Sequence, residues 1–270
     1  MNFLTEDEIE QLTLEILRDD LGYETLFGPH IAEGDAPERT HADVVLHRRL
    51  LEAIDRINPT IPAEAREEAF KKVLRASSPD MLQNNEAFHI MLTDGIDVKF
   101  RTATGTRSDK VWLVDYQQPE QNHFLAVNQY TVIENGTNKR ADVVLFVNGL
   151  PLVVIELKNA TDESADIYAA YQQLQTYKQT IPSLFQYNAF MIASDGWFAK
   201  AGTLSSNYSR FMQWKTADGE HMVDTEHETE LEPLLKGMLN KRALLDIIRY
   251  FLVFEKGKDK TIKKIAAYHQ

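Results

Sequence analysis

Two apolar segments on either side of an Asn148-Gly149 turn constrain the fold of this chain more than any other part of its sequence. Residues 140–147 and 151–158 are rich in β-branched side chains, and Asn-Gly is the most typical two-residue hairpin turn, so the segments predict paired strands. Three charged residues, Asp142, Glu156 and Lys158, lie within them. Because an unpaired buried charge is costly, we expect these three side chains to have a chemical role.

The register of this hairpin decides whether the two carboxylates meet. In a regular two-residue hairpin Val147 pairs with Leu150, and Asp142 and Glu156 then lie on opposite faces of the sheet. A shared site requires an even register, through a three- or five-residue loop or a β-bulge. Pro151 cannot donate to the strand ladder and favours such an irregularity.

The remaining pattern predicts an α/β chain in which a mixed β-sheet is flanked by helices. Hydrophobic periodicity indicates helices at about residues 5–21, 47–57, 63–75, 164–180, 229–239 and 241–254. Short apolar runs indicate strands at 88–92, 96–100, 111–116, 124–132, 141–147, 152–157 and 189–193, and weaker ones at 197–203 and 208–214. Residues 24–42 are expected to be a long loop. We expect one domain over residues 1–235 and a C-terminal helical connector over residues 236–270.

Charge and composition narrow the classes of function. The net charge is -12, but residues 1–40 carry -9 and residues 218–232 carry -7, which leaves +4 for the rest and permits contact with nucleic acid. The absence of cysteine excludes disulfides, a cysteine nucleophile and thiolate zinc sites. We expect no membrane span, since no apolar run approaches about 18 residues.

The charged triplet is suited to magnesium-dependent phosphodiester hydrolysis. Asp142 and Glu156 offer carboxylates, and the Leu157 backbone carbonyl is a candidate third ligand of Mg²⁺. Lys158 shares a strand face with Glu156 at about 6.5 Å, where it can orient a water or offset phosphate charge. Gln173 and Tyr177 are four residues apart on the next helix and share one of its faces.

These motifs together resemble the N-terminal nuclease domain of the restriction (R) subunit of type I restriction-modification enzymes, within the PD-(D/E)xK nuclease superfamily. Ala141 stands where the superfamily name has proline. The matching positions span almost the whole chain: Thr5-Glu6, Ile9-Glu10, Leu21-Gly22-Tyr23, Asn128-Gln129, Ala141 to Leu145, Ile155 to Asn159, Gln173, Tyr177, Ser194-Asp195-Gly196 and Tyr268-His269-Gln270.

The resemblance implies a restriction-endonuclease-like fold and a cytoplasmic endonuclease that cleaves double-stranded DNA with Mg²⁺. Asp142 and Glu156 would bind the metal and Lys158 would be catalytic, while Gln173 and Tyr177 would support DNA binding. A further acid would come from the first helix, with Glu10 the best match and Glu6 and Glu8 as competitors. The partners implied are the specificity and methyltransferase subunits. Since R subunits continue into an ATP-driven motor and no phosphate-binding loop occurs here, we expect a fragment that precedes the motor.

Alternatives remain open at this stage. One is a nuclease of recombination or repair, or a standalone restriction enzyme; another is a docking module for DNA or a partner without activity. Arg140 and Lys139 either face DNA or are solvated surface bases. Asp43, within a second Ala-Asp-Val-Val-Leu, is expected to be either a coincidence or a local cap. The C-terminal lysines, Lys263 among them, are expected to form a solvated face.

Overall fold

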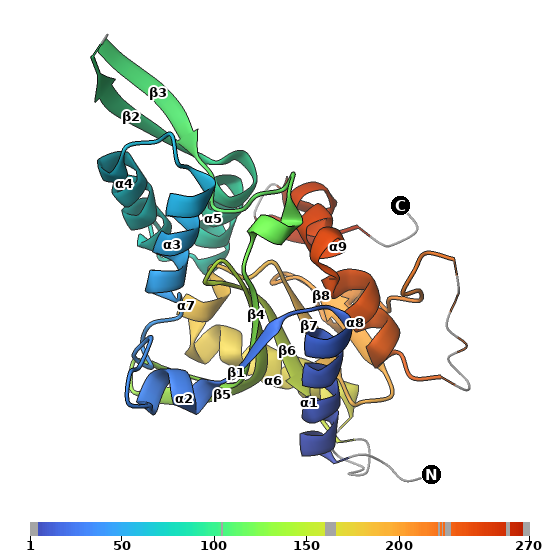
Figure 1. Cartoon of the computed structure of the whole chain (residues 1–270). Helices are drawn as coiled ribbons and strands as arrows, with labels where there is room; N and C mark the ends of the chain where they lie inside the picture. Colours follow the sequence, from blue (N-terminus) through green and yellow to red (C-terminus); the bar gives the residue numbers. More distant parts are fainter. Residues whose placement is uncertain are drawn as a thin grey trace.

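A six-stranded mixed β-sheet forms the centre of the computed structural model, which describes residues 5–103, 105–159, 166–220, 222, 224, 228–257 and 260–266 (Figure 1). The strand order is β1-β4-β5-β6-β7-β8, in which β1/β4 and β6/β7 are parallel pairs and the other pairs are antiparallel. The strands are β1 (Glu24–Phe27), β4 (Phe124–Glu134), β5 (Thr137–Val147), β6 (Leu150–Leu157), β7 (Phe190–Ser194) and β8 (Ala199–Gly202).

Helices flank this sheet, as predicted, and the fold is consistent with a restriction-endonuclease-like architecture. They are α1 (Glu6–Glu15) with its continuation η1 (Ile16–Asp20), α2 (Gly28–Glu33), α3 (His47–Ile57), α4 (Ala63–Leu74), α5 (Met81–Asp94), η2 (Pro119–Gln121), α6 (Ile167–Thr180), α7 (Pro182–Phe185), η3 (Tyr208–Arg210), α8 (Leu231–Leu239), α9 (Lys241–Asp246) and η4 (Ile247–Phe251). Thr5 and Glu8 cap α1 reciprocally. No helix in the described part of the chain has the length and apolar character needed to cross a bilayer.

Two hairpins lie outside the central sheet. The hairpin of β2 (Ile96–Thr102) and β3 (Gly105–Val111) projects beyond α3, α4 and α5 (Figure 1). The hairpin of β9 (Leu252–Lys256) and β10 (Thr261–Ile265) follows η4. The helix expected at 241–254 therefore ends at Phe251, and the connector at 236–270 is not wholly helical. The boundary near residue 235 stays a prediction.

Several predicted elements are wrong in kind. The strand expected at 88–92 lies inside α5, where Asp80 caps the helix and Phe88 and Leu92, four residues apart, face the core. The loop expected at 24–42 contains β1 and α2. Residues 112–116 do not form the strand expected at 111–116, because β3 ends at Val111. The weak strand expected at 208–214 is a 3₁₀ turn and one isolated bridge from Met212 to Ala201.

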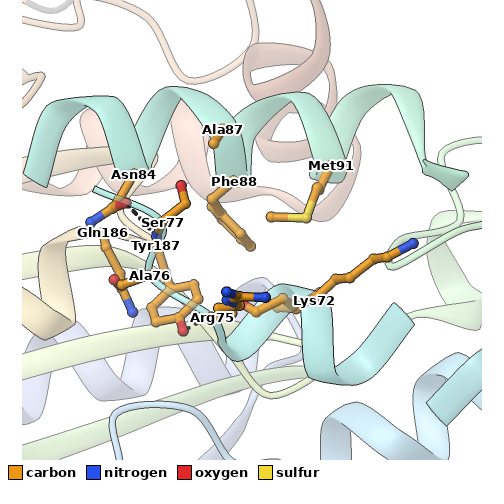
Figure 2. A pocket seen from close by; sticks show the side chains of 11 residues that line it. Lys72, Arg75, Ala76, Ser77, Asn84, Ala87, Phe88, Met91, Gln186 and Tyr187 are labelled. Carbon is orange, nitrogen blue, oxygen red and sulfur yellow. Dashed lines mark hydrogen bonds between the residues drawn. The ribbon is translucent and has the colours of Figure 1, made fainter. Parts of the chain in front are cut away.

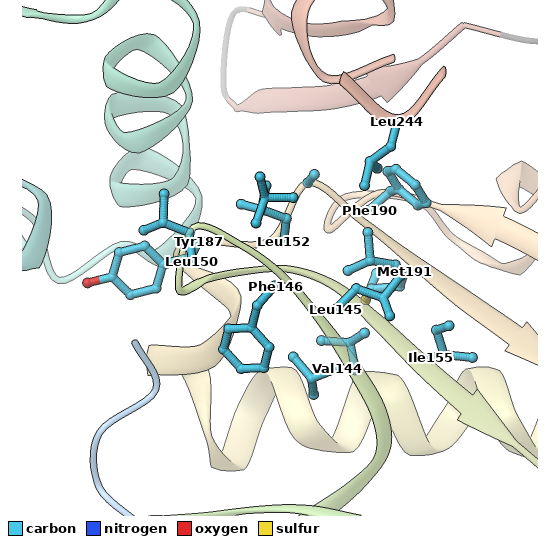
Figure 3. Packing of buried hydrophobic residues seen from close by; sticks show 14 of the residues in the cluster. Val144, Leu145, Phe146, Leu150, Leu152, Ile155, Tyr187, Phe190, Met191 and Leu244 are labelled. Carbon is cyan, nitrogen blue, oxygen red and sulfur yellow. The ribbon is translucent and has the colours of Figure 1, made fainter. Parts of the chain in front are cut away.

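The core is continuous around β5 and β6. All eight residues of β6 are buried, because the sheet is covered on both faces at this point. Figure 3 shows Val144, Leu145 and Phe146 of β5 close to apolar side chains of β6 and β7, with Leu244 of α9 nearby. Asp142 and Glu156 therefore lie at the edge of an apolar stretch formed by residues 143–147 of β5 and residues 150–155 of β6.

Lys263 of β10 is buried, so the prediction of a solvated face is wrong for this lysine. Its side chain is 1% exposed, and Nζ donates to Asn85 Oδ1 at 2.9 Å and to the Asn188 carbonyl at 2.7 Å. No carboxylate of the described residues lies within ion-pair distance of it. Burial lowers the pKa of Lys263 to about 7, since the interior penalises its charged form.

Replacing Lys263 by methionine is expected to remove a pH dependence of stability. The unfolded lysine has a pKa of about 10.4, so between pH 7 and 10 the unfolded chain holds more protons and wild-type stability rises with pH. The neighbouring His89, with a pKa of about 4, stays neutral throughout this window. Urea unfolding at pH 7 and pH 9 measures the effect: the wild type should gain on Lys263→Met at the higher pH. The wild type should not gain in this way on Lys71→Met, because Lys71 is exposed. If the stability of the wild type and of Lys263→Met changed with pH in parallel, the lowered pKa of Lys263 would be contradicted.

Candidate active site

A β-bulge sets the register of the β5–β6 hairpin. The turn is the expected two-residue type, with positive φ at Asn148 and Gly149 and with Val147 paired to Leu150. The register then shifts between Leu145 and Phe146, because Phe146 pairs with Pro151 and Leu145 with Val153. Leu152 is the extra residue. The predicted irregularity is confirmed, and it lies beside Pro151 rather than in the turn.

The bulge brings Asp142 and Glu156 to the same face. Val143 pairs with Ile155, so the next pair outward along the ladder is Asp142 with Glu156. Asp142 Oδ2 accepts a hydrogen bond from the Leu157 backbone N–H at 2.7 Å. Both carboxylates are enclosed, with 8% of Asp142 and 1% of Glu156 exposed. The two strands thus hold a pair of acids side by side in an apolar setting.

Lys158 completes the triplet at the end of β6. Its Nζ lies 3.1 Å from Glu156 Oε1 and donates to the Leu157 carbonyl at 2.8 Å. A third neighbour is Glu6 of α1, whose Oε1 lies 3.5 Å away. The ammonium group is therefore held between three oxygen atoms, and it is the one cation close to both buried acids among the described residues.

The ionisation of the triplet reflects its burial. Burial raises the pKa of Asp142 to about 6, against the opposing effects of the Leu157 N–H and Lys158. Burial, and then repulsion from Asp142, raises the pKa of Glu156 well above its ordinary value. Burial by itself would lower the pKa of Lys158, but the attraction of Glu156 and Asp142 outweighs it and raises that pKa. The site holds more negative charge than Lys158 alone can compensate.

The first helix brings two of its three candidate glutamates to the site. Glu10 is buried and accepts from the side-chain amides of Asn128, at 2.7 Å, and Gln129. Gln129 has a φ of 52°, interrupts the β4–β5 ladder opposite Asp142 and so directs its amide at Glu10. Glu6 reaches Lys158, as described above. Glu8 instead bonds with Thr5 in the helix cap and lies outside the site.

Helix α6 brings Tyr177 onto the same face and Gln173 beside it. The Tyr177 hydroxyl donates to the Arg140 carbonyl at 2.6 Å and lies 3.5 Å from Glu156 Oε1. Gln173, one helical turn earlier, lies close enough to the Tyr177 hydroxyl to influence its pKa. Arg140 is exposed and Lys139 is half-buried, and no carboxylate of the described residues is within ion-pair distance of either. The predicted grouping of Gln173 and Tyr177 with the triplet is thus observed, while Arg140 and Lys139 remain surface bases.

The donor set is compatible with a divalent cation. Glu156 Oε2 is buried without a hydrogen-bond partner among the described residues, although buried carboxylate oxygens normally have one. No group of three or more His, Cys, Asp or Glu side chains in the described ranges forms a ready-made metal site. A cation would instead rest on Asp142, Glu156 and the Leu157 carbonyl, the hard oxygen ligands that Mg²⁺ prefers, with water completing its coordination.

A surface pocket lies away from these residues. Figure 2 shows a pocket of about 410 Å³ between α4 and α5, lined by Lys72, Phe88, Met91 and Tyr187 among others. It contains none of the candidate site residues. This pocket is therefore separate from the charged triplet.

The family comparison agrees with the geometry. Residues 3–210 match the family described as the N terminus of the type I restriction enzyme R protein. The chain belongs to this family. It is similar to the HindI endonuclease subunit of Haemophilus influenzae, with 40% identity over 272 residues that cover 99% of this chain and 26% of the relative. It is also similar to a putative MjaIXP endonuclease subunit of Methanocaldococcus jannaschii, with 28% identity over 99% of this chain and 27% of the relative.

The family match includes every candidate site residue, but the relatives are much longer than this chain. The chain spans about a quarter of the length of these two curated relatives. Residues 268–270, which contributed to the predicted resemblance, lie outside the described residues.

The repeated pentapeptide at Asp43 lies at a local turn, since Asp43 Oδ2 accepts from Thr40 N and Thr40 Oγ1. The side chain closes this turn but caps no helix, since α3 begins after Leu46 without a side-chain cap.

The sequence did not reveal what Asn128 and Gln129 do. Both are among the positions that carry the family resemblance, and the structure shows that they hold Glu10 in place beside the acids. The signal that could have revealed them is an adjacent pair of amides inside an otherwise apolar strand.

Proposed function

We propose that this chain is the nuclease domain of a type I restriction subunit and that it cleaves double-stranded DNA endonucleolytically with Mg²⁺. The observation that carries the proposal is the bulge-set pairing of Asp142 with Glu156 beside Lys158. The names of the relatives, which are endonuclease subunits, support the same reaction class. The pairing matters because a one-residue change in register would place the two acids on opposite faces.

The triplet has a division of roles in this proposal. Asp142, Glu156 and the Leu157 carbonyl would hold Mg²⁺, which supplies positive charge where negative charge develops on the phosphate. The hydrogen bond from Leu157 N–H keeps the Asp142 carboxylate oriented, and burial keeps Glu156 from turning away into water. Lys158, freed from Glu156 once the acids have another partner, donates to the attacking water or to a phosphate oxygen.

Neighbouring side chains orient this group. Asn128 and Gln129 fix Glu10 close to Asp142, where Glu10 adds negative charge or a further ligand. Tyr177 ties α6 to β5 through the Arg140 carbonyl, and Gln173 is one turn away on the same helix. The two α6 side chains then lie where a phosphate or sugar of the bound strand would pass. Arg140 and Lys139, both unpaired with acids among the described residues, would contact the DNA backbone.

The setting of the reaction is part of the proposal. The protein would act in the cytoplasm with specificity and methyltransferase subunits, as the resemblance to restriction subunits implies. ATP would be used by a motor elsewhere in the subunit. Nothing in the candidate site is arranged to read bases, so cleavage would occur wherever the motor delivers DNA.

Nicking of supercoiled plasmid tests the proposal. At high protein concentration the chain should nick slowly with Mg²⁺ and not at all with EDTA, because the acids need the metal to act. Lys158→Ala should lower the rate by about 10²-fold, whereas Lys71→Ala, an exposed lysine on α4 paired with Glu67, should leave it unchanged. Nicking that survives EDTA, or that proceeds equally in Lys158→Ala, would show a different chemistry. A non-catalytic docking domain would bind DNA without any metal-dependent nicking.

A further inference from the structure

Three tyrosines form an exposed aromatic cluster beside the candidate active site. The Tyr168 and Tyr171 rings of α6 are stacked, with centroids 5.9 Å apart at 22°. Tyr208 of η3 meets both rings, at 4.9 Å from Tyr168 and 5.3 Å from Tyr171. Tyr171 and Tyr208 pack partly against the core, but Tyr168 is 44% exposed. An aromatic ring held by two others and open to solvent is a surface on which a planar ligand can stack.

The sheet register places this cluster next to the buried acids. Glu156 pairs with Ala193, and Ala193 pairs with Lys200 on β8. Directly paired residues point to one face, so Lys200 lies on the face of Asp142 and Glu156, about 10 Å from Glu156 between Cα atoms. Its Nζ stands over the Tyr208 ring at 4.7 Å. Only the small side chain of Ala193 separates Lys200 from Glu156 in this row.

Helix α6 gives the same placement independently. Tyr168 precedes Gln173 by five residues, or about 7.5 Å along the helix axis. Gln173 is one helical turn from Tyr177, whose hydroxyl lies beside Glu156. Helix α6 therefore borders the acids with one of its faces and carries the stacked tyrosines on another. The distance along the helix between the two is about the length of two nucleotides.

Positive charge continues from the cluster away from the acids. Arg210 is in the same 3₁₀ turn as Tyr208 and lines a groove of about 520 Å³ together with Ser205, Asn207, Lys260 and Lys264. Lys264 is paired with Glu255, but Lys200, Arg210 and Lys260 have no carboxylate within ion-pair distance among the described residues. The charge of Lys200 also acts on the nearby Glu230, whereas Arg210 and Lys260 form no close ion pair in the described part of the chain. Cations together with hydroxyl and amide groups suit a phosphate backbone, and they are notable in a chain of net charge -12.

We propose that Tyr168, Tyr208 and Lys200 bind an unpaired DNA strand next to the scissile phosphate, and that the Arg210 groove receives its following phosphates. The inference rests on the proposed nuclease function. A single strand is the fitting ligand because bases in a duplex are stacked inside it, whereas an unpaired base can lie on an exposed ring while nearby cations contact its phosphates. The tyrosine cluster thereby extends the candidate site into a track for one strand.

Binding of a fluorescent oligothymidylate to the 270-residue chain, followed by anisotropy at low salt in EDTA, tests this track without cleavage. Tyr168→Ala should weaken binding about 5- to 100-fold, the usual effect of losing one stacked base. Tyr168→Phe should bind as the wild type does, since it keeps the ring. Lys200→Gln should lower the slope of log affinity against log salt by about 0.7, one phosphate contact to a single strand. Tyr250→Ala is the matched control, because Tyr250 is 63% exposed on η4 and outside the cluster.

The outcomes separate this inference from the proposed function. Asp142→Asn should lose nicking yet bind the oligonucleotide normally. If Tyr168→Ala binds as tightly as the wild type, or if the chain does not bind single strands at all, the track is wrong while nicking by the triplet can still stand. If Tyr168→Phe is as weak as Tyr168→Ala, the hydroxyl and not the ring face makes the contact, and the stacking assignment is overturned.

Discussion

Replacing Asp142 by asparagine is expected to lower Mg²⁺-dependent nicking by at least about 10²-fold, since a metal's stabilisation of charge is worth several kcal/mol. The amide is nearly the same size and can still accept from the Leu157 N–H through its oxygen. It removes the negative charge, however, and leaves Glu156 as the one acid of the pair. Quantifying open-circular product against time with saturating protein measures the change.

The repeated pentapeptide supplies a matched control for Asp142. Asp43 occurs in the same Ala-Asp-Val-Val-Leu sequence, yet it caps a local turn through Thr40 and is remote in role from the triplet. Asp43→Asn should nick at the wild-type rate and cost at most about 1 kcal/mol of stability through its weakened cap. Equal losses of nicking in both variants would mean that folding, and not the acid at β5, explains the effect.

Replacing Glu156 by glutamine is expected to abolish nicking and, without metal, to stabilise the fold. Glu156 is 1% exposed, its Oε2 has no partner among the described residues, and its charge repels Asp142. A buried unsatisfied polar atom costs on the order of 1–3 kcal/mol, and more when charged, so the neutral side chain should relieve part of that cost. This gain in stability combined with a loss of activity is typical of an active-site residue.

The pH dependence of this stabilisation has a definite sign. The pKa of Glu156 is raised in the folded chain, so above its unfolded value of about 4.3 the folded chain holds the extra proton. Wild-type stability relative to Glu156→Gln should therefore fall as pH rises from about 4 through neutrality. Burial also raises the pKa of Asp142 to about 6. The stability of the wild type relative to Asp142→Asn should therefore also fall as the pH rises through this window.

Urea unfolding at pH 4.5 and pH 7.5, with EDTA or with Mg²⁺, measures both effects on Glu156→Gln. In EDTA the glutamine variant should gain on the wild type at the higher pH. With Mg²⁺ the order should reverse, because a ligand that binds only the folded wild type stabilises it by mass action. A variant that is less stable than the wild type at pH 7.5 in EDTA, or equal stabilisation of both proteins by Mg²⁺, would contradict the assignment of Glu156.

The site was largely predictable because its chemistry is local in the sequence. Asp142, Glu156 and Lys158 stand out because they are charged residues in apolar strands. A regular two-residue turn would place the two acids on opposite faces of the sheet, so they could meet only through an irregularity, which Pro151 favoured. The bulge at Leu152 satisfies that requirement. Helical spacing predicted that Gln173 and Tyr177 share a face, and α6 places Tyr177 beside Glu156 with Gln173 next to Tyr177.

The rest depended on tertiary contacts that periodicity does not contain. Phe88 and Leu92 fit either a strand or a helix in a short apolar run, and packing against the core decided for α5. Lys263 resembled its solvated neighbours, but it is enclosed by Asn85 and Asn188, which lie far away in the sequence. The choice among Glu6, Glu8 and Glu10 required knowing which face of α1 meets β4 and β6.

The position of a divalent cation in crystals of the chain soaked with Mn²⁺, located by its anomalous scattering, tests the metal site most directly. A peak is expected about 2.0–2.2 Å from a carboxylate oxygen of Asp142, Glu156 Oε2 and the Leu157 carbonyl oxygen, with Lys158 displaced from Glu156. The peak should vanish in Asp142→Asn crystals. A well-ordered site without a peak, or a cation bound elsewhere while these acids stay paired with Lys158, would contradict it.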